Sequence, residues 1–113
     1  MTTPVEFYVK TDSWPGETSW ALVNDCTGKV EKEMPSTDIP QYDEELKLYR
    51  HKLCLPDAEW TFTIEDSYGD GICCTEGGGY YGVVVDGKTA ASGGNFEYSE
   101  SFTFGSCPTP EVS

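Results

Sequence analysis

Positively charged residues are scarce in this chain. Its 113 residues include 7 Lys and Arg against 20 Asp and Glu, which gives a formal net charge of −13. A surface of this sign repels nucleic-acid phosphates and anionic lipids, so neither nucleic acid nor a membrane surface is an expected partner. No apolar run is long enough to insert into a membrane. The excess of carboxylates suits divalent cations such as Ca²⁺, although the same acidity could serve solubility alone.

Catalytic signatures are also missing. His51 is the single histidine, it lies between Arg50 and Lys52, and we expect it to be a solvated surface side chain. The sequence contains no H-E-x-x-H, no G-x-S-x-G and no C-x-x-C. The glycine-rich stretch 76–80 lacks the Lys-Ser/Thr ending of a phosphate-binding loop. We therefore expect no enzyme, and a small glycoside hydrolase that uses two clustered acids is the less favoured alternative.

The cysteine content points to an oxidising compartment. The five cysteines are Cys26, Cys54, Cys73, Cys74 and Cys107. In a small chain this number predicts two disulfides and one remaining thiol, with a connectivity that the sequence leaves open. A cytosolic protein with buried free thiols is the alternative. Met1 to Pro4 lead at once into a strand-like segment, so we expect a secreted module cut from a larger precursor.

Alternation of apolar and polar side chains is the main structural signal. It predicts strands around Val5–Val9, Trp20–Val23, Trp60–Glu65, Val83–Val85, Lys88–Ser92 and Phe102–Phe104. Asp86-Gly87 predicts a two-residue hairpin turn, and Thr27-Gly28 predicts a turn into a strand at Lys29–Glu31.

Other segments complete the predicted domain. Residues 33–45 are polar and indicate a long surface loop, and residues 43–51 fit a short helix or a strand, of which we favour the strand. Six to eight short strands separated by Gly, Pro and Asp turns predict an all-β fold, an antiparallel β-sandwich of jelly-roll type with calcium-binding loops. It would form one module over residues 1–107, followed by a tail or linker remnant over 108–113.

The segment Asp66-Ser67-Tyr68-Gly69-Asp70-Gly71 resembles part of a calcium loop. Asp66 and Asp70 take the first and fifth ligand positions of an EF-hand loop, and Gly71 takes the position of its sharp turn. The loop is incomplete, because Tyr68 replaces the third-position acid and Gly77 the closing Glu. Ca²⁺ takes six to eight oxygens, so further ligands would come from elsewhere. The alternative is that these aspartates only cap turns.

Two other segments could supply the missing oxygens. Asp12 and Glu17 lie in the turn that links the first two predicted strands. Glu97 and Glu100 lie near the last strand. The sequence thus predicts a metal site whose acids are distant from one another along the chain.

Aromatic side chains form a second candidate surface. Those that lie in turns or glycine-rich loops, outside the alternating core sets, are Trp14, Tyr68, Tyr80, Tyr81, Phe96 and Tyr98. Exposed rings can stack on sugar rings, while neighbouring polar groups bind the hydroxyls. The alternative is that these rings fold back over the ends of the sandwich.

A family resemblance covers nearly the whole chain, from about Val5 to Cys107. The motifs T-D-x-W-P-x-E-T-x-W and D-S-Y-G-D-G-I-C-C, with C-L-P-D, D-G-K and the later A-S-G-G-N-F-E-Y-S-E-S-F-T-F, carry it. They resemble the β-sandwich accessory modules of secreted peptidases of marine Bacteroidetes and of extracellular proteins of diatoms and other algae. The resemblance implies a non-catalytic, calcium-stabilised module that attaches to a surface or targets a substrate.

The resemblance also implies site residues. The family's acidic motif positions fall on Asp12, Glu17, Asp66, Asp70 and Glu100. It favours one disulfide between Cys54 and either Cys73 or Cys74, and a second between Cys26 and Cys107. Members often have Cys-Tyr where this chain has Glu59-Trp60, which fits the odd number of cysteines.

These observations together predict a calcium-binding module that binds an extracellular polysaccharide or another cell-surface or matrix component. Trp14, Tyr68, Tyr80, Tyr81 and Tyr98 are the candidate ligand-binding residues. The alternative is an adhesion or spacer module, stiffened by Ca²⁺, that binds protein.

Overall fold

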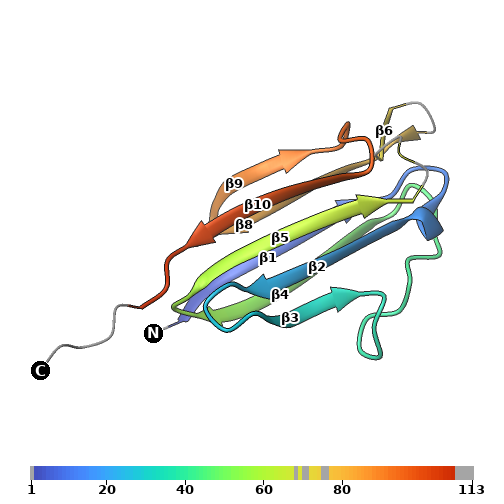
Figure 1. Cartoon of the computed structure of the whole chain (residues 1–113). Helices are drawn as coiled ribbons and strands as arrows, with labels where there is room; N and C mark the ends of the chain where they lie inside the picture. The colour runs from blue at the N-terminus through green and yellow to red at the C-terminus, as the bar shows by residue number, and fades with distance from the viewer. Residues whose placement is uncertain (1, 68, 70–71, 75–76, 109–113) are drawn as a thin grey trace, which may run out of the picture.

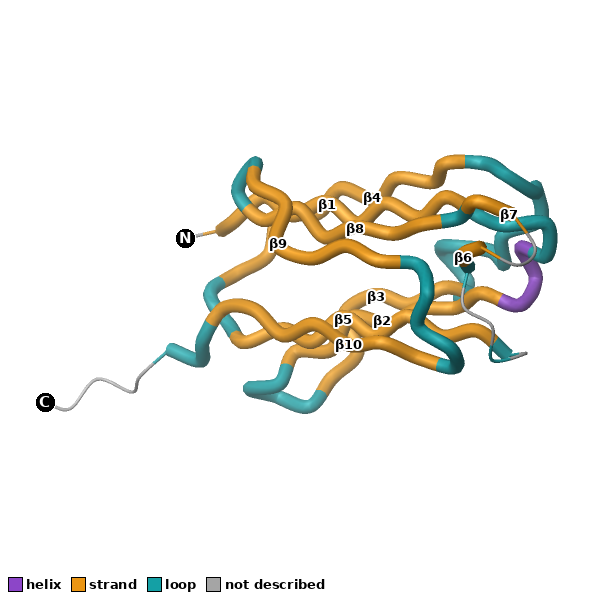
Figure 2. Tube along the Cα trace, turned by 90° about the horizontal axis from the view of Figure 1, so that it is seen from above, coloured by secondary structure: helices purple, strands orange, loops and turns teal. Residues whose placement is uncertain are grey.

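The computed structural model describes residues 2–67, 69, 72–74 and 77–108, without the side chains of Cys73, Cys74 and Gly77. Two antiparallel four-stranded sheets pack face to face, as the two layers of Figure 2 show. Sheet A has the order β4 (Leu48–Pro56), β1 (Thr2–Lys10), β8 (Tyr80–Val85), β9 (Lys88–Gly93). Sheet B has the order β10 (Ser99–Gly105), β5 (Glu59–Asp66), β2 (Thr18–Asn24), β3 (Lys29–Met34). The predicted all-β sandwich is confirmed, and the jelly-roll connectivity stays a prediction.

Two short strands and one short helix complete the described elements. β6 (Cys73–Cys74) pairs with β7 (Gly77–Gly78), and the 3₁₀ helix η1 (Pro15–Glu17) precedes β2. Figure 1 shows β6 and the β1–β2 connection at the end of the sandwich opposite the N-terminus. We call this end the loop end. No helix in the described part of the chain is long and apolar enough to cross a membrane.

The core follows from the alternation in the sequence. Val5, Phe7 and Val9 of β1 are buried, and so are Trp20, Leu22, Trp60, Phe62 and Ile64 of sheet B. The rings of Phe7 and Phe62 stack between the sheets with centroids 4.6 Å apart. Since each large apolar side chain contributes roughly 1.5–3 kcal/mol when it is fully buried, this layer supplies most of the driving force for folding.

The turns behave largely as predicted. Asp86 and Gly87 both have positive φ, 51° and 79°, which matches the twist of a two-residue hairpin between β8 and β9. Residues 48–56 form a strand, as favoured, but residues 43–47 belong to the preceding loop. Leu46, with φ of 53°, lies in the turn before β4.

Candidate functional site

The β1–β2 connection holds Asp12 in a fixed position. Thr11 and Asp12 follow β1 directly and are 0% and 2% exposed. The Asp12 Oδ1 accepts a hydrogen bond of 2.8 Å from the backbone N–H of Trp14, so Asp12 does cap its own turn. Thr11 Oγ1 donates to the Glu44 carbonyl at 2.7 Å, and the Leu46 N–H donates to the Asp12 carbonyl at 3.2 Å. The Asp12 turn is therefore braced by the loop before β4.

Asp66 ends β5 in a similarly closed environment. It is 2% exposed and lies opposite Thr18, the first residue of β2, which is 1% exposed. The Asp66 N–H donates to the Tyr98 carbonyl at 2.8 Å, and the next N–H, of Ser67, donates to the Glu17 carbonyl at 3.0 Å. The turn after β5 is thus joined by its backbone to the residue that precedes β2.

Close backbone packing connects the Asp12 turn to the segment that follows Asp66. A Cβ atom on Gly79 would lie 2.3 Å from the Ile72 carbonyl oxygen, 2.7 Å from the Lys10 carbonyl oxygen and 3.1 Å from the Asp12 nitrogen. Only glycine permits this approach. Asp12, Glu17, Thr18 and Asp66 consequently share the loop end of the sandwich, where η1, β6 and β7 also lie (Figure 2).

The predicted acids differ in where they lie. Asp12 and Asp66 are buried, and Glu17 is half-buried. Asp70 lies outside the described residues. Among the residues that the structure describes, no three His, Cys, Asp or Glu side chains approach closely enough to form a metal-binding group. The loop end therefore brings the Asp12 turn and the Asp66 turn together, and the joint metal site stays a prediction.

Glu100 has a different neighbour. Its Oε1 accepts a hydrogen bond from the hydroxyl of Tyr81, which joins β10 of sheet B to β8 of sheet A. Burial, and to a smaller degree this carboxylate, raise the pKa of Tyr81, so its hydroxyl stays protonated and serves as the donor. Glu100 also lines a hollow of about 420 Å³ with Gly79 and Tyr80.

Some of the predicted ligand-binding aromatic side chains are exposed and others are buried. Trp14, Tyr80 and Tyr98 are 54%, 43% and 65% exposed. Tyr81 and Phe96 are buried and pack edge to face with centroids 6.0 Å apart, so Tyr81 is a core residue and not a ligand-stacking ring. The reason is that β8 begins at Tyr80, which places Tyr81 on the inward side with Val83. Extending the alternation of Val83 and Val85 back by two residues would have placed Tyr81 on the inward face. Tyr68 lies outside the described residues.

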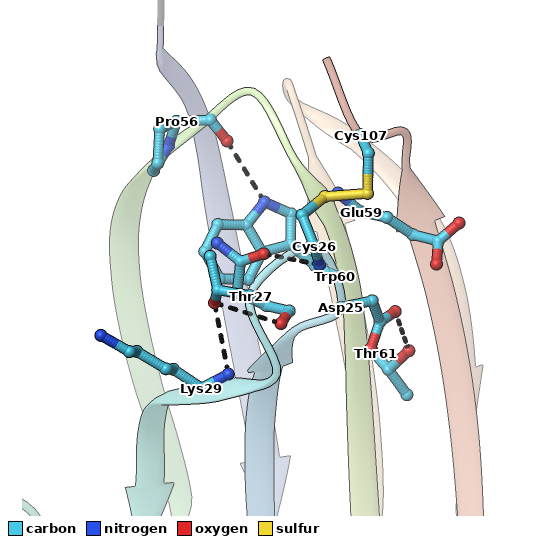
Figure 3. Close-up of a disulfide and its surroundings, with 10 residues drawn as sticks. Asp25, Cys26, Thr27, Lys29, Pro56, Glu59, Trp60, Thr61 and Cys107 are labelled. Carbon is cyan, nitrogen blue, oxygen red and sulfur yellow. Dashed lines mark hydrogen bonds between the residues drawn. A yellow bond between two sulfur atoms is a disulfide. The ribbon is translucent and has the colours of Figure 1, made fainter. Parts of the chain in front are cut away.

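One predicted disulfide is confirmed and the other is wrong. Cys26 and Cys107 are bonded, which ties the β2–β3 turn to the end of β10 beside Trp60 (Figure 3). Cys54 is an exposed free thiol opposite Pro4, whereas the β6–β7 region adjoins Lys10. Pro4 and Lys10 are six residues apart on β1, a separation of about 20 Å. The Cα atoms of two disulfide-bonded cysteines lie within roughly 7 Å of each other, so Cys54 is too far from β6. Of Cys73 and Cys74, the structure describes only the backbone.

The prediction for His51 was also wrong. Its ring lies between the sheets, half-buried, with its centroid 5.1 Å from that of Trp20. Its Nε2 lies 2.7 Å from the Tyr42 hydroxyl, which accepts a hydrogen bond of 2.9 Å from Trp20 Nε1. Burial lowers the pKa of His51. The alternation that points Arg50 and Lys52 outward is the signal that would have placed His51 inward.

Comparisons with protein-family models, with curated proteins and with solved structures found no match to this chain.

Proposed function

We propose that this protein is a non-catalytic extracellular module that binds Ca²⁺ at its loop end and attaches to a carbohydrate or another cell-surface or matrix component. One observation carries the calcium part of the proposal. Asp12 and Asp66 come from separate turns, are each 2% exposed, and belong to turns that pack at the same end. Burying carboxylates costs free energy, which hydrogen bonds or a coordinated cation offset.

The proposed ligands suit a hard cation. Asp12 and Asp66 would supply carboxylate oxygens, and Glu17 of η1, whose carbonyl accepts the Ser67 N–H, is a third candidate. Thr18, opposite Asp66 and fully buried, adds a hydroxyl oxygen. Ca²⁺ accepts such mixed oxygen ligands, and bound Ca²⁺ would hold the two turns together. Asp70 is the further candidate from the sequence.

The attachment part of the proposal is supported by exposed aromatic side chains. Trp14 and Tyr98 lie in the loop-end connections and are more than half exposed. Rings of this kind contribute large contact areas to carbohydrate and protein partners. The Cys26–Cys107 disulfide is compatible with an extracellular location.

Thermal unfolding with Ca²⁺ and with EDTA tests the metal site. A ligand at about 100 times its dissociation constant adds roughly 2.7 kcal/mol, so EDTA should lower the melting temperature by several degrees or more. Asp12→Asn and Asp66→Asn should each abolish this difference. Asp57→Asn removes the same charge at the exposed β4–β5 turn and should leave the difference intact. A wild-type melt that is identical in both buffers would contradict the calcium proposal.

A glycan array probed in Ca²⁺ and in EDTA tests the attachment. We expect binding to at least one class of extracellular polysaccharide. Binding to none, together with a normal calcium response, would favour the protein-binding spacer instead.

A further inference from the structure

Charge is divided unevenly between the two sheets. The strands of sheet A carry four Lys and Arg residues and one acid, Glu6, a formal charge of +3. The strands of sheet B carry two Lys and six acids, a formal charge of −4. In a chain of net charge −13, sheet A is therefore a local basic region.

The strand register places three of these bases, Lys10, Arg50 and Lys52, on the outer face of sheet A. Because Val5, Phe7 and Val9 point into the core, Glu6, Tyr8 and Lys10 point outward. On β4, Arg50 and Lys52 share the outer face, opposite Tyr8 and Glu6. The Arg50 side chain is 59% exposed and Lys52 is exposed, so both can reach a ligand.

Aromatic rings lie beside these bases. A Cβ atom on Gly82 would lie 2.1 Å from Tyr8 Cζ, so the Tyr8 ring covers β8 where that strand has no side chain. The Tyr80 ring lies 6.0 Å from that of Tyr8, centroid to centroid, and the Lys10 Nζ lies 5.9 Å from the Tyr80 centroid. The outer face thus combines exposed ring surface with ammonium and guanidinium groups.

A hollow continues the same face toward the N-terminal end. It has a volume of about 430 Å³, and its lining includes Pro4, Glu6, Lys52, Cys54 and Val84. Glu6 accepts a hydrogen bond of 3.4 Å from Arg50, which holds the guanidinium over the sheet. An arginine has five N–H donors, so the others remain available to an anion.

We propose that the outer face of sheet A binds an anionic polysaccharide through Arg50, Lys52 and Lys10, with Tyr80 and Tyr8 as the surface on which sugar rings stack. This inference rests on the proposed function as an attachment module and names its ligand class. Carboxylate or sulfate groups pair with guanidinium and ammonium groups, and sugar rings pack on aromatic faces. The acidic side chains on the rest of the protein repel an anionic chain, which confines such a ligand to this face. It also disfavours nucleic acid, whose charge density is higher.

Isothermal titration with three probes tests the ligand class. The probes are an oligogalacturonate for carboxylate, a dextran sulfate oligomer for sulfate, and neutral dextran of equal length. We expect one or both charged chains to bind, neutral dextran to bind more weakly, and added NaCl to weaken the charged interaction by screening. Single-stranded DNA that binds as tightly as the charged sugars would overturn the proposal.

Paired variants test the location. Arg50→Ala with Lys52→Ala should weaken binding about tenfold, since two exposed charge contacts are worth roughly 1.4 kcal/mol together. Lys29→Ala with Lys32→Ala removes the same charge from β3 of sheet B and should have little effect. Tyr80→Ala should weaken binding, whereas Val30→Ala, at an exposed apolar side chain of β3 in sheet B, should not. Equal losses in both double variants, or no loss in the first, would overturn the inference.

The calcium response separates this inference from the proposed function. Charged sugars that fail to bind while Ca²⁺ still raises the melting temperature would overturn the sheet A surface alone. A missing calcium response, with charged-sugar binding that still depends on Arg50 and Lys52, would overturn the metal site alone.

Discussion

Trp20, Tyr42 and His51 form a hydrogen-bonded chain that anchors the loop before β4 to the interior. Trp20 Nε1 donates to the Tyr42 hydroxyl, whose oxygen lies 2.7 Å from His51 Nε2. Tyr42 donates to His51 Nε2 when the neutral imidazole carries its proton on Nδ1. Tyr42 is 2% exposed and stacks on Tyr49 with centroids 3.9 Å apart.

Replacing Tyr42 with Phe should therefore be costly. The variant keeps the ring but leaves the buried Trp20 N–H without its acceptor, which should lower the free energy of unfolding by about 1–3 kcal/mol. Chemical denaturation measures the change. Tyr80→Phe, which alters an exposed hydroxyl, is the control and should change stability little.

His51 should make stability depend on pH. Burial lowers its pKa from the ordinary 6.5, so the unfolded chain takes up this proton at a higher pH than the folded chain. The contribution of neutral His51 to the free energy of unfolding is complete above about pH 6.5. It is lost as the pH falls through the lowered pKa of the folded state. Asp38 and Asp43 line the same hollow as His51, but the pKa of His51 is still lowered, because burial is the dominant effect on it.

Melting temperatures in EDTA at about pH 7.5 and about pH 5.5 check this prediction. The wild type should be less stable at the lower pH, and His51→Gln should reduce the difference. An equal difference in both proteins would assign the pH dependence to other groups.

At the scale of the elements, the approach of β7 and β8 to the β1–β2 turn depends on Gly79. Its missing Cβ leaves room for the carbonyl oxygens of Ile72 and Lys10, which are backbone atoms and cannot rotate away. This contact is what joins the Asp12 turn to the segment after Asp66.

Gly79→Ala should thus destabilise the protein by about 1–3 kcal/mol and weaken its response to Ca²⁺. Gly78→Ala is a closely matched control, because a Cβ atom there meets nothing within 4 Å. Thermal melts of both variants with and without Ca²⁺ provide the comparison. Equal behaviour of the two variants would show that the contact is not needed.

At the scale of the whole molecule, the disulfide joins positions 81 residues apart in the sequence. Closing so long a loop restricts the unfolded chain, and its loss should cost about 2–5 kcal/mol. Cys26→Ser with Cys107→Ser should show this loss in denaturant melts under non-reducing conditions. Cys54→Ser changes an exposed free thiol and should leave stability almost unchanged.

Local pattern alone determined the fold class and most strands. Alternation of apolar and polar side chains is set by neighbouring residues, so Val5–Val9, Trp20–Val23 and Trp60–Glu65 could be placed on strands directly. The Asp86-Gly87 hairpin was predictable for the same reason, since positive φ is a local property of these residue types. The errors at Tyr81 and His51 arose where the alternation was not followed far enough along the strand.

Only the tertiary structure decided which distant residues meet. Cys54 could not be paired from the sequence because the register of β4 along β1 places it at the opposite end of the sandwich from β6. The proximity of the Asp12 and Asp66 turns depends on how the two sheets stack, which no local pattern encodes. The separation of charge between the sheets likewise appears only when β1, β4, β8 and β9 lie side by side.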